Sequence, residues 1–179
     1  MIDWNVVVTV NEGTFEEACL YLEQFGYVSS TDYYNVLAMR VYDVSAFTDA
    51  LRQDLEAKPD VPQILSHVIP VTEKIEFEQP SEFERKAGEI LENWAERLAG
   101  KTFHVRVHRR GFRSRMSSEE EERLLGARIF DTLQEAGAEC EVGFEDPDAI
   151  VAVETLGKEA GLSFWTREDL ERYPFLGLD

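Results

Sequence analysis

The chain has 179 residues, of which 36 are acidic and 18 are basic, so its formal net charge at pH 7 is −18. Hydrophobic residues make up 44% of the sequence, enough for one or two folded cores, which excludes a wholly disordered chain. An evenly spread charge of this sign would also exclude binding to nucleic acids or anionic membranes, because like charges repel.

Several other classes of protein are excluded by short motifs that the sequence lacks. No apolar run reaches the length of about 18 residues that a membrane-spanning helix needs, and the N-terminus has no signal-peptide pattern. Cys19 and Cys140 are far apart in sequence and fit neither a disulfide framework nor a metal-ligand spacing. We expect a cytoplasmic protein with no metal site and no cofactor.

Residues 1–79 alternate between strand and helix patterns. Strands are predicted at 4–10, within a hairpin over 27–44, and at 64–77, the last as one long or two short strands. The helices between them follow Thr14 and Ser45, which are the expected N-caps. The βαββαβ order predicts a ferredoxin-like domain.

Residues 80–179 form a second predicted domain, after a boundary near Gln79–Ser81. Apolar spacing predicts a helix over 83–98 and a longer one that ends at Gly137, with Ser118 and Glu121 as a capping box. Strands are predicted at 101–108, 140–144, 149–155 and 161–165, before a short helix capped by Thr166. The fold class is α+β, with an α/β second domain.

The strand over 101–108 alternates between two kinds of side chain. Phe103, Val105 and Val107 point to one face, and the polar side chains at 104, 106 and 108 point to the other. His104 and His108 are about 13 Å apart along the strand, too far to bind one metal ion, so we expect them to be exposed or to contact phosphate. Asp146 and Asp148 flank a proline and indicate a turn rather than a catalytic carboxylate pair.

The positive charge is concentrated in one segment. The 22 residues from Arg97 to Ser118 contain seven basic residues, two histidines and no acid. One interpretation is a solvated strand and loop whose cations pair with the glutamates of the next helix. The other is an anion-binding stripe, because six of the seven are arginines, whose planar fork fits phosphate oxygens.

Four separated segments occur in an order that resembles the THUMP domain. They are Lys101–Gly111 (KTFHVRVHRRG), Ser117–Gly126 (SSEEEERLLG), Phe144–Asp148 (FEDPD) and Ile150–Glu154 (IVAVE). That domain occurs in tRNA thiouridine synthases, RNA methyltransferases and some pseudouridine synthases, usually after a small ferredoxin-like domain. The resemblance covers residues 80–165, and over residues 1–79 it rests on the order of elements.

The resemblance implies binding of tRNA, most directly its acceptor end, by the two domains acting as one unit. No catalytic motif follows residue 165, so we expect a non-catalytic adaptor that presents tRNA to a separate modifying enzyme such as a cytidine acetyltransferase. The alternatives are a protein-interaction module and a non-catalytic subunit of a split tRNA thiolation or methylation enzyme. The residues predicted to contact RNA are Lys101, Arg106, His108, Arg109, Arg110, Arg113, Arg115, Arg123 and Arg128.

Overall fold

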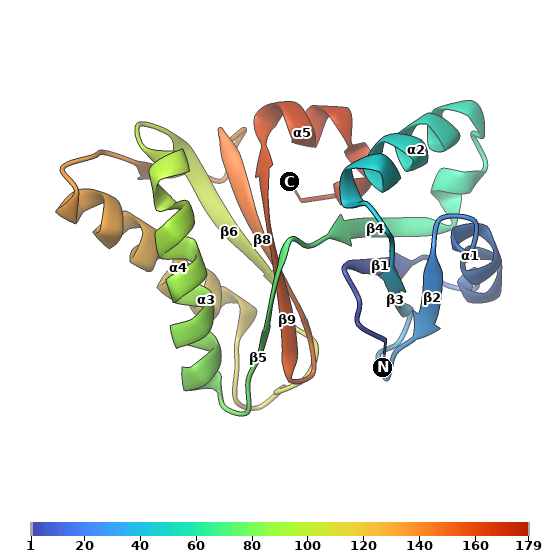
Figure 1. Cartoon of the computed structure of the whole chain (residues 1–179), viewed down its shortest axis with the longest axis horizontal. Helices are drawn as coiled ribbons and strands as arrows, with labels where there is room; N and C mark the ends of the chain where they lie inside the picture. The colour runs from blue at the N-terminus through green and yellow to red at the C-terminus, as the bar shows by residue number, and fades with distance from the viewer. Residues whose placement is uncertain (1, 179) are drawn as a thin grey trace. The chain divides into compact units, whose positions relative to one another are not determined.

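The computed structural model describes residues 2–178, which divide into two compact units. The first unit comprises the chain up to Val71 together with Leu170–Gly177, and the second comprises Thr72–Asp169 and Leu178. Each unit has its own sheet (Figure 1). Within the described residues, no helix is long and apolar enough to cross a bilayer.

The first unit is a four-stranded antiparallel sheet with two long connections that form helices. Its strands lie in the order β2-β3-β1-β4, so β1 pairs with both β3 and β4. This is the split βαβ arrangement, and the predicted ferredoxin-like fold is confirmed. The elements are β1 (Val6–Val10), α1 (Phe15–Leu22), β2 (Tyr27–Ser30), β3 (Val36–Arg40), α2 (Val44–Ala57), a 3-10 helix (Val61–Gln63) and β4 (Leu65–Pro70).

The core of this unit lies between its sheet and its two helices. Alternate residues of β1 and β3 point to the helices because successive side chains of a strand lie on opposite faces. A second 3-10 helix (Pro174–Leu176), late in the chain, adds Phe175 to the same cluster. The buried members include Val6, Val8, Val10, Ala18, Leu22, Leu37, Met39, Phe47 and Leu51.

Of the two predicted N-caps, Thr14 holds the N-cap position of α1 without a side-chain capping bond, and Ser45 is corrected. Asp43, not Ser45, is the N-cap of α2, and its side chain accepts a hydrogen bond from the backbone N–H of Ala46 at 2.8 Å. Thr14 precedes α1 but makes no side-chain cap, because its hydroxyl donates to the carbonyl oxygens of Asn11 and Ile64. The N-terminal loop of α1 is thereby tied to the residue that precedes β4.

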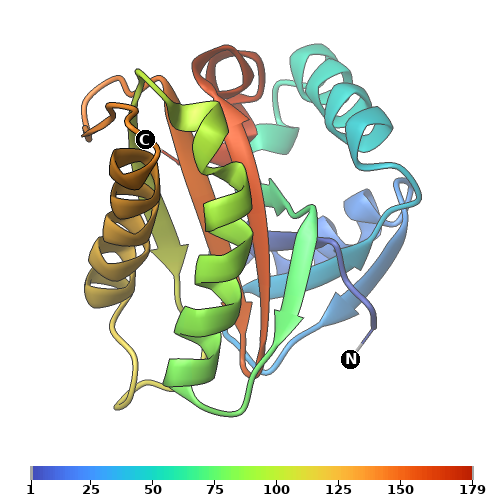
Figure 2. The ribbon, with the colours of Figure 1, turned by 60° about the vertical axis from the view of Figure 1, so that its left-hand side comes forward.

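The second unit is a five-stranded sheet in the order β5-β9-β8-β6-β7. Strand β6 runs parallel to both β7 and β8, and the remaining pairs are antiparallel. Helices α3 and α4 lie side by side in front of this sheet (Figure 2). The elements are β5 (Glu73–Glu76), α3 (Pro80–Trp94), a 3-10 helix (Ala95–Leu98), β6 (Thr102–His108), α4 (Ser118–Glu135), β7 (Glu141–Val142), β8 (Ala149–Leu156), β9 (Glu159–Thr166) and α5 (Arg167–Arg172).

The helices cover the apolar face that the alternation of β6 predicts. Phe103, Val105 and Val107 are buried in one cluster with apolar residues of both helices and of β8. The helical members of that cluster include Phe83, Ala87, Leu91, Leu125, Ile129 and Leu133, which follow the expected helical spacing. This packing fixes the position of β6 and hence of the loop that follows it.

Three local differences from the sequence prediction concern this unit. Strand β5 pairs with β9, although the predicted boundary placed residues 73–76 in the first domain. Strand β7 is two residues long because the chain leaves β6 after Val142. The N-cap of α4 is Ser117 rather than Ser118, since the Ser117 hydroxyl accepts from the Glu120 N–H.

Candidate RNA-binding surface

The predicted RNA-binding residues occupy three places in the second unit. Most lie on β6 or on the loop 109–117 that joins it to α4, while Arg123 and Arg128 lie on α4 itself. Lys101 precedes β6, so the length of the strand, about 26 Å, separates it from Arg109. The structure therefore places the three arginines at 109, 113 and 115 on one short loop and Lys101 away from them.

Phe112 anchors the loop to the core. Its ring lies 5.3 Å from that of Phe77, between ring centroids, and its carbonyl oxygen accepts hydrogen bonds from Arg115 and Met116. The backbone turns sharply here, with φ of 97° at Gly111 and 50° at Phe112. Since a bulky residue rarely adopts a positive φ, the core contact of the ring must hold this turn. Phe112 is thus a packing residue, not a base-stacking one.

The three arginines around this anchor have no carboxylate partner within residues 2–178. Arg109 donates to the Gly111 carbonyl oxygen at 2.5 Å, and Arg115 donates to the side-chain oxygen of Gln79. Arg113 is exposed and makes no hydrogen bond or ion pair in the described part of the chain. Their charges remain available to an external anion.

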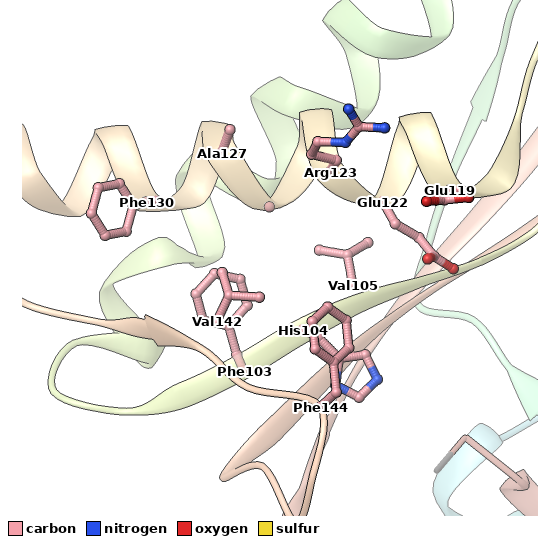
Figure 3. Close-up of a pocket in the computed structure, with 11 residues that line it drawn as sticks. Phe103, His104, Val105, Glu119, Glu122, Arg123, Ala127, Phe130, Val142 and Phe144 are labelled. Carbon is pink, nitrogen blue, oxygen red and sulfur yellow. The ribbon is translucent and has the colours of Figure 1, made fainter.

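His104 corrects one expectation, because it is buried rather than exposed (Figure 3). Its Nδ1 lies 3.0 Å from the carbonyl oxygen of Gly143, and the Phe144 ring covers it at 5.2 Å between centroids. Burial lowers the pKa of the imidazole, which is therefore neutral near pH 7. A carbonyl oxygen only accepts, so Nδ1 carries the proton and Nε2 is an acceptor.

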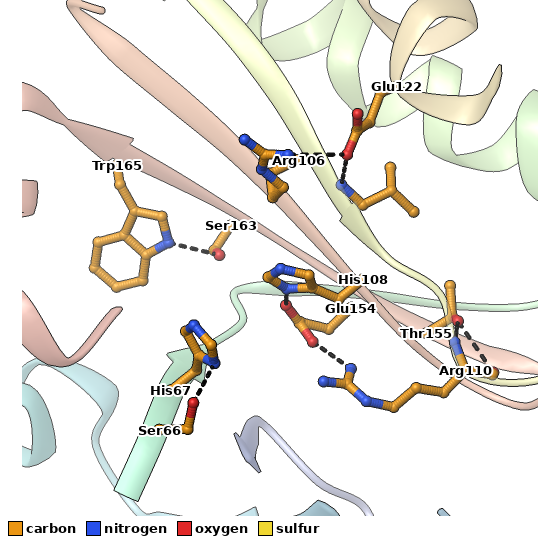
Figure 4. A network of polar contacts seen from close by, with 11 residues as sticks. Ser66, His67, Arg106, His108, Arg110, Glu122, Glu154, Thr155, Ser163 and Trp165 are labelled. Atoms are coloured by element: carbon orange, nitrogen blue, oxygen red, sulfur yellow. Dashed lines mark hydrogen bonds and ion pairs between the residues drawn. The ribbon is translucent and has the colours of Figure 1, made fainter. Parts of the chain in front are cut away.

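His108 and Arg110 converge on one buried carboxylate, that of Glu154 (Figure 4). His108 lies directly opposite Glu154 in the parallel register of β6 and β8, and Arg110 follows two residues later. The distances are 2.5 Å from Nδ1 of His108 to Oε1 and 2.5 Å from Nη1 of Arg110 to Oε2. Thr155 also bonds both the N–H and the carbonyl oxygen of Arg110. Glu154 is therefore paired with the Arg110 guanidinium through one carboxylate oxygen and contacts the His108 ring through the other.

Arg106 and Arg128 also face acidic side chains. Arg106 lies 3.8 Å from Glu122 of α4, whose carboxylate accepts the Val107 N–H at 3.0 Å. Arg128 pairs with Glu92 of α3 at 2.5 Å and so joins the two helices. The Arg106–Glu122 pair matches the alternative interpretation, in which the basic strand and loop pair with the glutamates of the next helix.

The nine predicted residues thus form two groups. Four are held by carboxylates of the same unit: Arg106, His108, Arg110 and Arg128. Five have no such partner within residues 2–178: Lys101, Arg109, Arg113, Arg115 and Arg123. The sequence analysis missed Glu154, although one charged residue inside the apolar run of β8 signals a buried acid that needs a cation.

The predicted turn at Asp146 and Asp148 ties β6 to β8. Asp148 accepts hydrogen bonds from the N–H of Thr102 at 2.9 Å and from its hydroxyl, which holds the pKa of the carboxyl below its usual value. Arg167 pairs with both aspartates. Among residues 2–178, no cluster of His, Cys, Asp and Glu side chains could hold a metal ion.

Comparison with protein families finds one match in this unit. The model of the family described as "THUMP domain" matches residues 80–164. None of the curated protein sequences compared with the chain matches it.

Comparison with solved structures extends the similarity to both units. The fold resembles that of PH1313 from Pyrococcus horikoshii, with 15% identity and a TM-score of 0.58 over 90% of this chain and 54% of that one. TrmN from Thermus thermophilus has 18% identity and a TM-score of 0.54, over 89% of this chain and 44% of that one. A 4-thiouridine synthetase in complex with RNA and ATP has 15% identity and a TM-score of 0.55, over 90% of this chain and 41% of that one. The chain spans about half the length of these proteins, and at such identities the likeness is one of fold.

Proposed function

Because residues 80–164 of this chain are a THUMP domain, we propose that the protein binds tRNA and presents it to a separate tRNA-modifying enzyme in the cytoplasm. The observation that carries the proposal is the loop 109–117. It projects three arginines without carboxylate partners from a core-anchored turn, in a chain with twice as many acids as bases. The solved 4-thiouridine synthetase of similar fold was crystallised with RNA, which supports the same ligand class.

The mechanism of binding follows from charge and shape. A-form RNA exposes phosphates and 2′-hydroxyls that a protein can contact without reading bases. Arg109, Arg113 and Arg115 can each donate two hydrogen bonds to one phosphate through the guanidinium fork. The acidic surface elsewhere repels RNA, so binding is confined to this loop and depends strongly on salt.

The binding test is a tRNA titration over a range of salt concentrations, with two triple variants of equal charge change. Replacing Arg109, Arg113 and Arg115 with alanine should reduce the slope of log K against log salt by about 2 to 3, because each phosphate that a cation neutralises adds about 0.7–0.9 to that slope. The control replaces Arg40, Arg52 and Arg85, which form exposed ion pairs elsewhere. Equal slopes in the two variants would refute the assignment.

The adaptor role requires a second measurement, because binding alone does not imply presentation. A cytidine acetyltransferase is our first candidate for the partner, and the assay measures acetylcytidine formed in tRNA with and without this chain. We expect the wild-type chain to raise the yield and the loop triple variant not to do so. A rise with the variant equal to that with the wild type would contradict presentation through the loop.

One observation favours a second candidate, a protein-interaction subunit of a split thiolation or methylation enzyme. Residues 1–80 contain 14 acidic and four basic residues, an unfavourable balance for a domain that touches RNA. This candidate predicts that an enzyme copurifies with the chain after nuclease treatment and at high salt. The adaptor proposal predicts that the association is lost under those conditions.

A further inference from the structure

A groove of about 620 Å³ lies between β6, α4 and the chain around β7 (Figure 3). Its walls are one face of α4, the first half of β6 and the chain at 142–144. Phe103 and Val105 form its floor, and Phe130, Val142 and Phe144 surround it. Its volume and lining are typical of a ligand site.

The apolar side chains around the groove are unusually accessible. Phe130 is 37% exposed, Val142 45% and Phe144 65%. Single exposed apolar residues are normal on a protein surface, but a contiguous group around a hollow marks a site of interaction. Phe130 lies on α4, Val142 on β7, and Phe144 on the chain that follows β7.

Gly126 lies beside the groove and has no side chain to fill it. It lies inside the 18-residue helix α4, where glycine costs about 1 kcal/mol relative to alanine. A Cβ at this position would have no atom within 4 Å, so nothing within the chain requires the small residue. Gly88 of α3 is different, because the Arg128 guanidinium packs 2.6 Å from where its Cβ would lie. The space over Gly126 is therefore available to another molecule.

His104 lies beside the groove, with its ring on the opposite face of β6 from Phe103 and Val105 and under the Phe144 ring. Its Nε2 is buried and has no hydrogen-bond partner among the described residues, although Nδ1 is satisfied by Gly143. A buried polar atom without a partner is uncommon in a folded chain.

The charge around the groove identifies the kind of molecule. Glu119, Glu122 and Arg123 line the groove, and residues 139–146 beside it carry four acidic and no basic residues, so the net charge around the groove is −5. A phosphate backbone is repelled from such a rim, and Lys or Arg side chains are attracted to it. Charge complementarity thus favours a basic polypeptide over RNA.

We propose that this groove binds a basic segment of a partner protein, which inserts one or two large apolar side chains over Gly126 and places lysines or arginines against the acidic rim. The arrangement of an apolar anchor inside a charged rim is that of a protein–protein hot spot. The inference goes beyond RNA binding and does not rest on it, because none of the groove's apolar residues belongs to the arginine loop.

The probe is a fluorescein-labelled peptide, KKLFKK, titrated with the full chain in the absence of RNA and followed by anisotropy. The matched peptides EELFEE and KKSSKK test the rim and the anchor separately, and both should bind at least about tenfold more weakly. Equal binding of all three peptides would overturn the proposal. Binding of a single-stranded RNA at the groove, in place of KKLFKK, would also overturn it.

Two variants locate the binding in the chain. Gly126→Phe fills the hollow and should weaken KKLFKK binding at least about tenfold, while the control Gly126→Ala should change it less than about twofold. If Gly126→Phe does not fold, Val142→Lys adds a repelling charge at an exposed position and should have the same effect. tRNA binding by these variants should equal that of the wild type, which separates this proposal from the previous one. Unchanged peptide binding in both variants would refute the site.

Discussion

Arg110 and Glu154 form an ion pair in which the carboxylate is completely buried and the arginine side chain is only 14% exposed. The two residues are 44 positions apart, and the contact joins the loop after β6 to the middle of β8. The same carboxylate also holds His108. The pair therefore stabilises the start of the loop that carries the proposed RNA-binding arginines.

Removing this carboxylate should destabilise the protein strongly. Glu154→Ala removes the carboxylate that faces Arg110 and His108 in the interior, and we expect a loss of about 3–5 kcal/mol in the free energy of unfolding. Glu56→Ala removes one partner of an exposed ion pair and should cost less than about 1 kcal/mol. Urea denaturation of both variants measures the difference, and similar losses would mean that the buried pair has no special role.

The stability of the second unit should fall as the pH rises from about 4.5 to about 7. Burial and the neighbouring Glu84 raise the pKa of Glu121 from 4.5 to about 7. Between these values the folded state binds a proton that the unfolded state does not, so the free energy of unfolding decreases with rising pH. Glu121→Gln should remove this dependence and stabilise the protein by about 1–2 kcal/mol at pH 8.

Urea denaturation at pH 5 and pH 8 tests this effect. The wild type should lose more stability between the two values than the Glu121→Gln variant does. The matched control is Glu119→Gln, two residues earlier at an exposed position of α4. A wild-type pH dependence retained in Glu121→Gln would show that another group is responsible.

The same substitution at two helical glycines should have opposite consequences. Gly126→Ala meets open space and should stabilise the protein by about 1 kcal/mol, through helix propensity. Gly88→Ala places a methyl group against the Arg128 guanidinium, which must move away from Glu92, so the propensity gain is lost. Thermal unfolding compares the two, and equal stabilisation would contradict the close packing of Arg128 on Gly88.

The cap of α2 provides a test in the first unit. Asp43→Ala removes the acceptor of the Ala46 N–H and should cost about 1 kcal/mol. Ser45→Ala, at the residue that the sequence pattern favoured, should change the stability by less than about 0.5 kcal/mol. Chemical denaturation distinguishes them, and a larger loss for Ser45→Ala would restore the original prediction.

Periodicity was enough to predict the elements that build the two sheets. The apolar residues of β6 alternate at period two, and those of α4 recur at helical spacing, so their burial in one core follows directly. The ferredoxin-like order of elements in the first unit could also be predicted, because each of its strands and helices has its own pattern of residues in the sequence. Caps were predicted less well, since adjacent serines and aspartates fit the same position and only the backbone geometry selects one.

The partners of the charged residues could not be predicted in the same way. The alternation of side chains along β6 predicted that Arg106 and His108 share one face of the strand. It did not predict which carboxylates lie beside them. Glu154 reaches His108 through the β6–β8 register, which is a contact between segments far apart in sequence. His104 is buried for a similar reason, because Phe144 from a later segment covers it. Local patterns therefore identified the cations without showing which of them are already neutralised.

The division of the chain into two units has a consequence for the order in which those units can fold during synthesis. Leu170–Gly177 belongs to the first unit, where Tyr173 donates to Asp49 and Phe175 joins the core. A Cβ at position 177 would lie 2.3 Å from Cδ2 of His67, so a side chain larger than that of Gly177 does not fit there. The part of the fold that emerges first from the ribosome is thus completed last, while Thr72–Asp169 is inserted within it as a continuous segment that can fold earlier.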